Sequence, residues 1–424
     1  MRQPLARTVS ARRGTDARTP EARLAEAVGL AHAIDLNVVD QGLVPLSDIR
    51  PATYIGKGKV DEIAGLVKSL EASLVLMDCP VSPVQQRNLE KAWNAKVLDR
   101  TGLILEIFGR RARTREGSLQ VELAHLSYQK GRLVRSWTHL ERQRGGHGFL
   151  GGPGETQIEA DRRALDERIA RIEDELEKVK RTRTLHRESR KRVPYPVVAL
   201  VGYTNAGKST LFNRMTAATV LSADMLFATL DPTLRAVELP HGMKVILSDT
   251  VGFISDLPTM LVAAFRATLE EVIESDIILH VRDISHEDAE AQSQDVETVL
   301  GELGIAATDR RLIEVWNKID CLDPEARARF ANLIERQAIG RRAVMVSAVS
   351  GEGLDRLADA IETRLGERRQ TLAVSLDPAD GAGLSWLYRH TEVLSKDMED
   401  DGRLAVTIRA DPDKAARVRA KFGA

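Results

Sequence analysis

A phosphate-binding loop is the feature that most constrains the fold. The stretch Gly202-Tyr-Thr-Asn-Ala-Gly-Lys-Ser209 matches the pattern G-x-x-x-x-G-K-[ST]. It follows an apolar, strand-like run at 197–201 and precedes a helix-like segment at 210–215. Glycines let consecutive backbone N–H groups converge on a phosphate, and the helix dipole adds a favourable field there. The chain is therefore expected to contain an α/β domain built around a nucleotide.

Two side chains of this loop and a second motif predict the phosphate chemistry. Lys208 is expected to reach the β- and γ-phosphates, and the Ser209 hydroxyl to occupy a Mg²⁺ position. The second motif, Asp249-Thr250-Val251-Gly252, ends another apolar run. A carboxylate opposite the loop can hold Mg²⁺, directly or through water, and Gly252 lets a backbone N–H approach the γ-phosphate. Lys208 and Gly252 are therefore candidate catalytic groups.

A third motif predicts which base is read. Apolar runs at 277–281, 312–316 and 343–346 are typical of further strands, and the second of these leads into Asn317-Lys318-Ile319-Asp320. The Asp320 carboxylate can accept from both the N1–H and the exocyclic amine of guanine, and adenine lacks that pair of donors. The order of the three motifs predicts a GTP site.

Length and composition suggest more than this one domain. At about 150 residues per domain, a chain of 424 residues suggests about three domains. No apolar run approaches the ~20 residues of a membrane span, and the basic start lacks the apolar core of a secretory signal. Cys79 and Cys321 lie in different predicted domains and are expected to be reduced thiols. We expect a cytoplasmic monomer, with at most peripheral membrane association.

The chain divides into five predicted segments. Residues 1–21 are rich in Arg, Ser and Thr and predict a disordered basic tail. Helical patterns alternate with short strands, one beginning at 38–39 and the others at 74–77 and 96–98, which predicts a small parallel α/β domain over 22–110. A helical hairpin follows at 111–192, the nucleotide-binding domain at 193–366, and a small α+β domain at 367–424. In the last of these we expect a helix at 385–394, a strand at 403–408 and a helix at 412–422.

The hairpin is predicted by two apolar stripes at helical spacing, from Leu119 to Leu140 and from Ile158 to Val179. The connector between them has six glycines within 145–154. Such a loop is either a plain linker or a binding tip that becomes ordered on contact, and the basic helix end beside it favours the tip.

Charge is distributed unevenly along the hairpin. Residues 110–144 carry nine Lys or Arg against three acids, and residues 178–192 carry eight against Glu188 alone. Between them, 155–177 hold nine acids and four bases. Basic runs are common on solvated helix faces, yet two runs that bracket an acidic one suit a polyanion such as RNA.

With these motifs the chain resembles the HflX family of translational GTPases, in the Obg–HflX superfamily, from Ala22 onward. The most specific matches are Gly151-Gly-Pro-Gly-Glu-Thr-Gln157 and Phe227-Ala-Thr-Leu-Asp-Pro-Thr233. The others are Tyr54-Ile-Gly-Lys-Gly-Lys-Val60, Asp99-Arg-Thr-Gly-Leu-Ile-Leu105, Arg111-Ala-Arg-Thr-Arg-Glu-Gly-Ser-Leu-Gln-Val-Glu-Leu123 and the phosphate-binding loop.

The resemblance implies a GTP hydrolase that binds the large (50S) ribosomal subunit and splits stalled or idle 70S ribosomes. It implies that Thr229 is the second Mg²⁺ ligand beside Ser209 and joins the catalytic candidates. It also implies rRNA contacts through the 145–154 loop and the basic hairpin helices. The nucleotide-binding candidates are then Gly202, Tyr203, Thr204, Asn205, Ala206, Gly207, Lys208, Ser209, Phe227, Ala228, Thr229, Leu230, Asp231, Asp249, Thr250, Val251, Gly252, Asn317, Lys318, Ile319, Asp320, Ser347, Ala348 and Val349.

Two features leave questions open. Ras-like enzymes have a water-orienting glutamine where this chain has Phe253, so we expect slow intrinsic hydrolysis that large subunits stimulate. The HflX family is also credited with an ATP-directed activity in its N-terminal region. The stretch Gly56-Lys57-Gly58-Lys59 is not a full phosphate-binding loop and favours a tight turn, which leaves ATP binding there open.

Two other functions compete with ribosome splitting. A related GTPase that modifies tRNA should have a reactive cysteine near its C-terminal end, and the sequence has no cysteine after Cys321. A GTP-switched RNA-binding factor of large-subunit assembly remains the alternative. A KH-type Gly-x-x-Gly loop would support it, and the sequence has none after Gly366.

Overall fold

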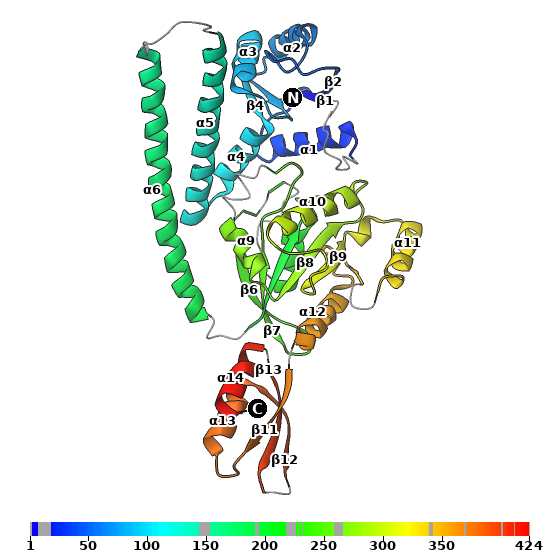
Figure 1. Cartoon of the computed structure of the whole chain (residues 1–424). Coiled ribbons are helices and arrows are strands. Elements are labelled where there is room, and N and C mark those ends of the chain that lie inside the picture. Colours follow the sequence, from blue (N-terminus) through cyan, green and yellow to red (C-terminus); the bar gives the residue numbers. More distant parts are fainter. Residues whose placement is uncertain are drawn as a thin grey trace. The chain divides into compact units, whose positions relative to one another are not determined.

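The computed structural model of the chain describes residues 2–6, 18–143, 153–190, 195–217, 226, 227, 229, 230, 232–257, 266–338, 342–368, 370–399, 402–410 and 412–423 (Figure 1). The chain divides into two compact units. The first comprises Met1–Val237 and Ile246–Glu352, and the second comprises Glu238–Val245 and Gly353–Ala424. Among the described helices, none has a stretch long and apolar enough to cross a membrane.

The N-terminal part of the first unit contains two parallel strand pairs. Strand β1 (Arg2–Ala6) pairs with β2 (Gly42–Leu46), and β3 (Leu74–Met77) pairs with β4 (Lys96–Asp99). The helices are α1 (Pro20–His32), α2 (Lys57–Ser69), α3 (Pro83–Trp93) and α4 (Arg100–Arg111).

Two predictions for this region were wrong. The segment 1–21 is not wholly a disordered tail, because Arg2–Ala6 form a strand and α1 begins at Pro20. The strand expected to begin at 38–39 begins instead at Gly42 and runs to Leu46, where it pairs with β1. Both errors have one cause: backbone pairing with a distant segment stabilises these strands, and neither segment carries a strong local pattern.

Local capping interactions fix where α1 and α4 begin. Thr19 Oγ1 accepts from the Ala22 N–H at 3.2 Å, with Pro20 in the first turn of α1. Asp99 Oδ1 accepts from the Gly102 N–H at 2.8 Å at the start of α4. Such caps satisfy N–H groups that have no partner inside the helix. They set the positions of two helices that contact the nucleotide-binding region.

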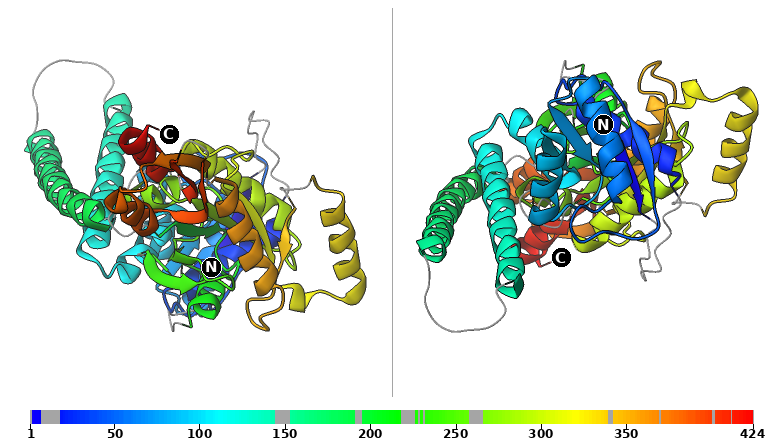
Figure 2. Two further views of the ribbon diagram at one scale, coloured as in Figure 1. Left: turned by 90° about the horizontal axis from the view of Figure 1, so that it is seen from below. Right: turned by 90° about the horizontal axis from the view of Figure 1, so that it is seen from above.

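The predicted hairpin is confirmed. Helices α5 (Arg115–Gln143) and α6 (Pro153–Arg190) run side by side in both views of Figure 2. Leu126, Ile172 and Leu176 form the buried centre of their interface. Across it, Arg168 Nε donates to Glu122 Oε1 at 3.0 Å, and Lys130 pairs with Asp166. Of the connector predicted at 145–154, residues 145–152 lie outside the described residues.

A six-stranded sheet forms the nucleotide-binding part of the first unit. Its strand order is β10 (Val344–Met345), β9 (Leu312–Asn317), β8 (Ile277–Asp283), β5 (Val197–Gly202), β7 (Lys244–Asp249) and β6 (Thr233–Glu238). The neighbours from β10 to β7 pair in parallel. The helices are α7 (Lys208–Thr216), α9 (Arg266–Ile273), α10 (Ala289–Glu302) and α11 (Pro324–Glu335). Because these strands are parallel, their carboxyl ends meet at one edge, where ligands bind in such sheets.

One apolar core joins this sheet to the N-terminal helices. Ala199, Val201 and Ile278 on one face of the sheet belong to the same buried cluster as residues of α9 and α10. The cluster continues into Leu30 of α1 and Phe108 of α4. The N-terminal helices and the sheet are therefore held together by burial of shared apolar surface.

The second unit contains a small antiparallel sheet in the order β11 (Gln370–Leu376), β13 (Leu404–Ala410) and β12 (Glu392–Met398). Its helices are α12 (Leu354–Arg368), α13 (Gly381–His390) and α14 (Pro412–Phe422). The α+β class is confirmed, but the helix expected at 385–394 ends at His390. The last residues of the expected helix, from Glu392, form the start of β12. The side chains of β12 are mostly exposed, so this segment lacks the alternation of buried and exposed residues that is typical of a strand.

One histidine of the central sheet is fully buried among apolar strands. His280 of β8 is 1% exposed, and neither ring nitrogen has a hydrogen-bond partner among the described residues. Burial, assisted by the charges of Arg282 and Lys208, lowers its pKa to about 3. The folded state therefore binds this proton less readily than the unfolded state does. The free energy of unfolding keeps its full value above the unfolded pKa of about 6.5 and decreases as the pH falls below it.

We therefore predict that His280→Leu flattens the acid side of the stability profile. Between pH 6.5 and 4, the wild-type protein should lose up to about 1.4 kcal/mol more per pH unit than the variant. Thermal unfolding measured at half-unit pH steps tests this, with the exposed His32→Leu as control. Parallel profiles for the wild type and His280→Leu would contradict the prediction.

Candidate nucleotide site

Two glycines of the phosphate-binding loop occupy positions that no side chain can share. Gly202 has φ +151°, and a Cβ there would lie 2.2 Å from the Val281 carbonyl oxygen. Gly207 has φ +91°, and a Cβ there would lie 2.2 Å from Asn317 Nδ2. The loop is therefore pressed against β8 at one end and against Asn317 at the other.

Lys208 opens helix α7 and is 6% exposed. Its Nζ donates to the carbonyl oxygens of Gly202 at 3.0 Å and Tyr203 at 2.7 Å. Burial lowers the pKa of the ammonium to about 8, against the opposing effect of Asp249. Gly207 is the N-cap residue of α7 and has no side chain with which to cap the first N–H groups of this helix. A helix start of this kind, beside a lysine, suits a phosphate group.

Three oxygen-bearing side chains converge beside Lys208. Ser209 Oγ donates to Asp249 Oδ2 at 2.7 Å, and Thr229 Oγ1 donates to the same oxygen at 2.9 Å. The two hydroxyl oxygens are 2.9 Å apart. Burial raises the pKa of Asp249, although the bond from Ser209 and the charge of Lys208 oppose it. Asp249 Oδ1 is buried and has no hydrogen-bond partner among the described residues.

The Asp-x-x-Gly segment lies directly against the phosphate-binding loop. A Cβ on Gly252 would lie 2.9 Å from Thr204 Cγ2 and 3.0 Å from Lys208 Nζ. The Phe253 N–H donates to the Gly202 carbonyl at 3.1 Å, and the Thr204 N–H donates to the Phe253 carbonyl at 2.7 Å. Gly252 is thus beside the lysine because it has no side chain.

Other side chains of this segment point into the protein. Thr250 Oγ1 donates to the Leu200 carbonyl at 2.5 Å, and Val251 is buried. Phe253 is 1% exposed and lies in the main apolar core. Its ring therefore neither orients a water molecule nor faces the site.

At the other end of the site, Asn317 joins two loops. Its Nδ2 donates to the Ala206 carbonyl at 2.8 Å, and its Oδ1 accepts from the Ala348 N–H at 3.0 Å. Lys318 adopts φ +64° and pairs with Asp283 at 2.7 Å. The Ser347 hydroxyl, by hydrogen bonding, holds the pKa of exposed Asp320 below its usual value. Recognition of guanine requires an ionised, solvent-facing carboxylate that can accept hydrogen bonds from the base.

Not every predicted residue joins this group. The Phe227 ring packs edge-on against Phe108 with centroids 4.7 Å apart, and Leu230 is buried in the same core. Val349 is 70% exposed. Ala228 and Asp231 lie outside the described residues. Of the residues between 227 and 231, Thr229 is the one whose described side chain meets Asp249.

The weaker Gly-Lys stretch at 56–59 is the start of a helix. Gly56 caps α2 in an extended conformation, and α2 begins at Lys57. Lys59 pairs with Glu62 of the same helix at 2.6 Å. The stretch is therefore the N-cap and first turn of α2, and the tight turn favoured by the sequence is not what forms there.

Sequence reasoning missed one set of residues at the site. Tyr203 of the phosphate-binding loop hydrogen-bonds through its hydroxyl to Arg18, Glu26 and the N–H of Ser255. Arg18 and Glu26 belong to the N-terminal part of the chain, and no local motif marks them. Only the folded arrangement shows that they contact the site.

The arrangement at this sheet edge is that of a P-loop GTPase. Four family models match the chain in sequence order: "GTP-binding GTPase N-terminal" at 21–109, "GTP-binding GTPase Middle Region" at 111–190, "50S ribosome-binding GTPase" at 197–318 and "HflX C-terminal domain" at 332–424. GTPase HflX of Magnetococcus marinus is 50% identical, over 91% of this chain and 88% of its own length. GTPase HflX of Escherichia coli is 47% identical, over 85% and 83% respectively. The chain belongs to the HflX family and is a GTP hydrolase, as the resemblance predicted.

Solved structures show a more distant similarity. The crystal structure of SsGBP with GDP is 26% identical, with a TM-score of 0.47 over 80% of this chain and 94% of that one. A GTP-binding protein from Sulfolobus solfataricus, also with GDP, is 23% identical, with a TM-score of 0.42 and the same coverage.

We predict that Asp320→Asn changes the base preference without disturbing the fold. The amide can donate to the extra carbonyl of xanthine and no longer accepts both guanine donors. Affinity for GDP should fall at least tenfold while affinity for xanthosine diphosphate rises. Titration with fluorescent nucleotides measures both, and exposed Asp355→Asn serves as control. Unchanged GDP affinity would remove Asp320 from base recognition.

Proposed function

We propose that this site binds GTP together with Mg²⁺ and that Lys208, Thr229 and Gly252 are its catalytic groups. Lys208 neutralises charge on the β- and γ-phosphates, and the Gly252 N–H donates to the γ-phosphate. Asn317 and Asp320 hold the guanine, backed by the loop from Ser347 to Val349. The observation that carries the proposal is the convergence of Ser209, Thr229 and Asp249 beside a buried lysine.

The donor set fits a magnesium ion. Mg²⁺ prefers oxygen ligands and keeps part of its water shell. Ser209 and Thr229 offer hydroxyl ligands, and Asp249 offers a carboxylate whose buried Oδ1 has no hydrogen-bond partner within the described part of the chain. Bound there, Mg²⁺ supplies positive charge to the β- and γ-phosphates. The chain's own part is to orient these oxygens and to exclude water from the carboxylate.

Removing either hydroxyl should affect hydrolysis more than GDP binding. For Ser209→Ala and Thr229→Ala we expect kcat to fall by about tenfold or more, with higher Mg²⁺ needed for half-maximal rate. GDP affinity should change by less than about threefold for Thr229→Ala. Phosphate release at varied Mg²⁺ measures the effect, with exposed Thr298→Ala as control. An unchanged Mg²⁺ requirement would refute the ligand assignment.

We further propose that the protein acts in the cytoplasm on the large ribosomal subunit and splits stalled or idle 70S ribosomes. Support comes from the match at 197–318 to a family described as 50S ribosome-binding GTPases and from the long α5–α6 hairpin. The basic runs at 110–144 and 178–192 suit rRNA phosphates. In this proposal the glycine-rich tip enters a narrow cleft and contacts rRNA near the peptidyl-transfer region.

Because the ring of Phe253 lies in the core, no side chain at that position orients water. Large subunits should therefore raise GTP turnover at least tenfold, which corresponds to about 1.4 kcal/mol of barrier. Single-turnover hydrolysis with and without purified 50S subunits tests this. A fast rate without ribosomes that depends on a nearby polar residue would show that the site is complete alone.

Replacing residues 145–154 by a short Ser-Gly linker tests the tip. Nucleotide affinity should stay intact, because none of the proposed nucleotide-binding residues lies within 145–154. Subunit-stimulated hydrolysis and splitting should both fall, and splitting should fall further. Sucrose gradients of 70S particles with GTP or its analogue measure splitting. If the variant splits 70S particles at the wild-type rate, the loop is only a connector between the two helices.

Assembly of the large subunit is the second candidate function, since it needs the same subunit binding. The same gradients separate the two. Splitting converts 70S particles to subunits in a purified system, whereas an assembly factor binds immature particles and leaves 70S particles intact.

A further inference from the structure

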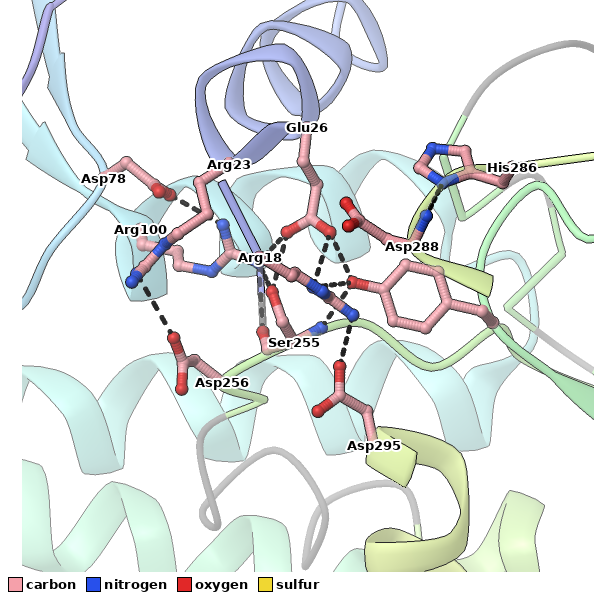
Figure 3. A network of polar contacts seen from close by, with 11 residues as sticks. Arg18, Arg23, Glu26, Asp78, Arg100, Ser255, Asp256, His286, Asp288 and Asp295 are labelled. Atoms are coloured by element: carbon pink, nitrogen blue, oxygen red, sulfur yellow. Dashed lines mark hydrogen bonds and ion pairs between the residues drawn. The ribbon is translucent and has the colours of Figure 1, made fainter. Parts of the chain in front are cut away.

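A buried polar network joins the N-terminal helices to the nucleotide site (Figure 3). Glu26 of α1 lies at its centre, with a side chain 14% exposed. Its Oε1 accepts from Arg100 and, at 2.8 Å, from the Ser255 hydroxyl. Its Oε2 accepts from Arg18 at 3.3 Å and from the Tyr203 hydroxyl. One carboxylate of the N-terminal domain thus binds both the phosphate-binding loop and the segment after Gly252.

Two guanidinium groups, of Arg18 and Arg100, pair with three carboxylates in this network. Arg100, whose side chain is 7% exposed, also donates to Asp78 at 2.6 Å, and Arg18 pairs with Asp295 at 2.5 Å. Burial tends to raise the pKa of Glu26, but the charge of Arg100 and the bond from Tyr203 hold it below its usual value. The carboxylate therefore stays ionised and remains a strong acceptor, because bonds to charged groups are stronger than neutral ones.

The backbone N–H, the carbonyl and the hydroxyl of Ser255 all form hydrogen bonds in this network. Its N–H donates to the Tyr203 hydroxyl at 2.8 Å, and its hydroxyl donates to Glu26. Arg100 Nη2 donates to the Ser255 carbonyl at 3.0 Å and to its hydroxyl oxygen at 2.9 Å. The second switch, defined as residues 249–256, is therefore fixed a short distance beyond Gly252. Asp256 adds an exposed pair with Arg23 at 3.4 Å.

Tyr203 connects this network to the phosphate-binding loop. Its carbonyl accepts from Lys208, its backbone forms a bridge with Phe253, and its ring lies under Arg18. In this arrangement Gly252 lies against Lys208, and Thr229 meets Ser209 and Asp249. Lys208, Thr229 and Gly252 are the groups that the proposed function assigns to catalysis at the γ-phosphate, which GTP has and GDP lacks.

We infer that Glu26 is a positioning residue of the GTP site, which acts through Tyr203 and Ser255 to hold the second switch closed. The network then favours GTP over GDP. By thermodynamic reciprocity, GTP must also favour the docked state of α1 more than GDP does. The inference needs GTP binding by the site and is independent of any ribosomal role.

The test compares variants that each remove one hydroxyl or one charge. Tyr203→Phe and Glu26→Gln keep the size of the side chain, and Ser255→Ala serves if either fails to fold. Tyr128→Phe is the matched control, because Tyr128 also donates to a buried carboxylate, Asp99, but does not touch the nucleotide site. Affinities for a non-hydrolysable GTP analogue and for GDP are measured with Mg²⁺ and without ribosomes.

We expect the analogue to bind about tenfold more weakly to Tyr203→Phe and Glu26→Gln, and GDP less than twofold more weakly. The control should keep the wild-type ratio. Hydrogen exchange over 20–32 should be slower with the analogue than with GDP in the wild type, and this difference should vanish in Tyr203→Phe. An equal loss of both affinities would mean a merely structural role, and unchanged affinities would mean no role. Either result overturns the inference.

Discussion

The Asn317 side chain sets the geometry on which the nucleotide site depends. It hydrogen-bonds to Ala206 on one side and to Ala348 on the other, so three loops from three strand ends meet at one amide. The contact is close enough that a Cβ on Gly207 would overlap it at 2.2 Å. The separation between the phosphate end and the base end of the site is therefore fixed by backbone packing. A nucleotide meets a preformed frame at both ends.

Buried charges serve two different purposes in this unit. Lys208 and Asp249 are buried. Burial lowers the pKa of the lysine and raises the pKa of the aspartate, so it favours the uncharged form of each. Asp249 Oδ1 has no hydrogen-bond partner among the residues that the structure describes, which is costly unless a ligand supplies one. Glu26, by contrast, has donors on both oxygens. Lys208 and Asp249 are thus arranged to meet a ligand, whereas the network around Glu26 connects parts of the protein to one another.

The N-terminal helices are structurally part of the nucleotide site. Phe227 packs on Phe108 of α4, and Arg100 at the start of α4 holds the second switch. Helix α4 ends at Arg111, just before the first hairpin helix begins at Arg115. In the proposed function, this continuity gives a physical route between the nucleotide and the hairpin. The route consists of packed helices and one charge network, and each part can be varied separately.

The sequence by itself determined the phosphate-binding loop, the order of the three nucleotide motifs, the hairpin and the family. These features follow from short patterns: glycines where the backbone needs them, and apolar residues at helical spacing. Tertiary structure alone decided that Arg2–Ala6 form a strand, that Phe227 turns into the core and that Glu26 meets Tyr203 and Ser255. Each of these depends on a partner far away in the chain, and a single polar residue carries no local signal of the partner that folding will bring to it.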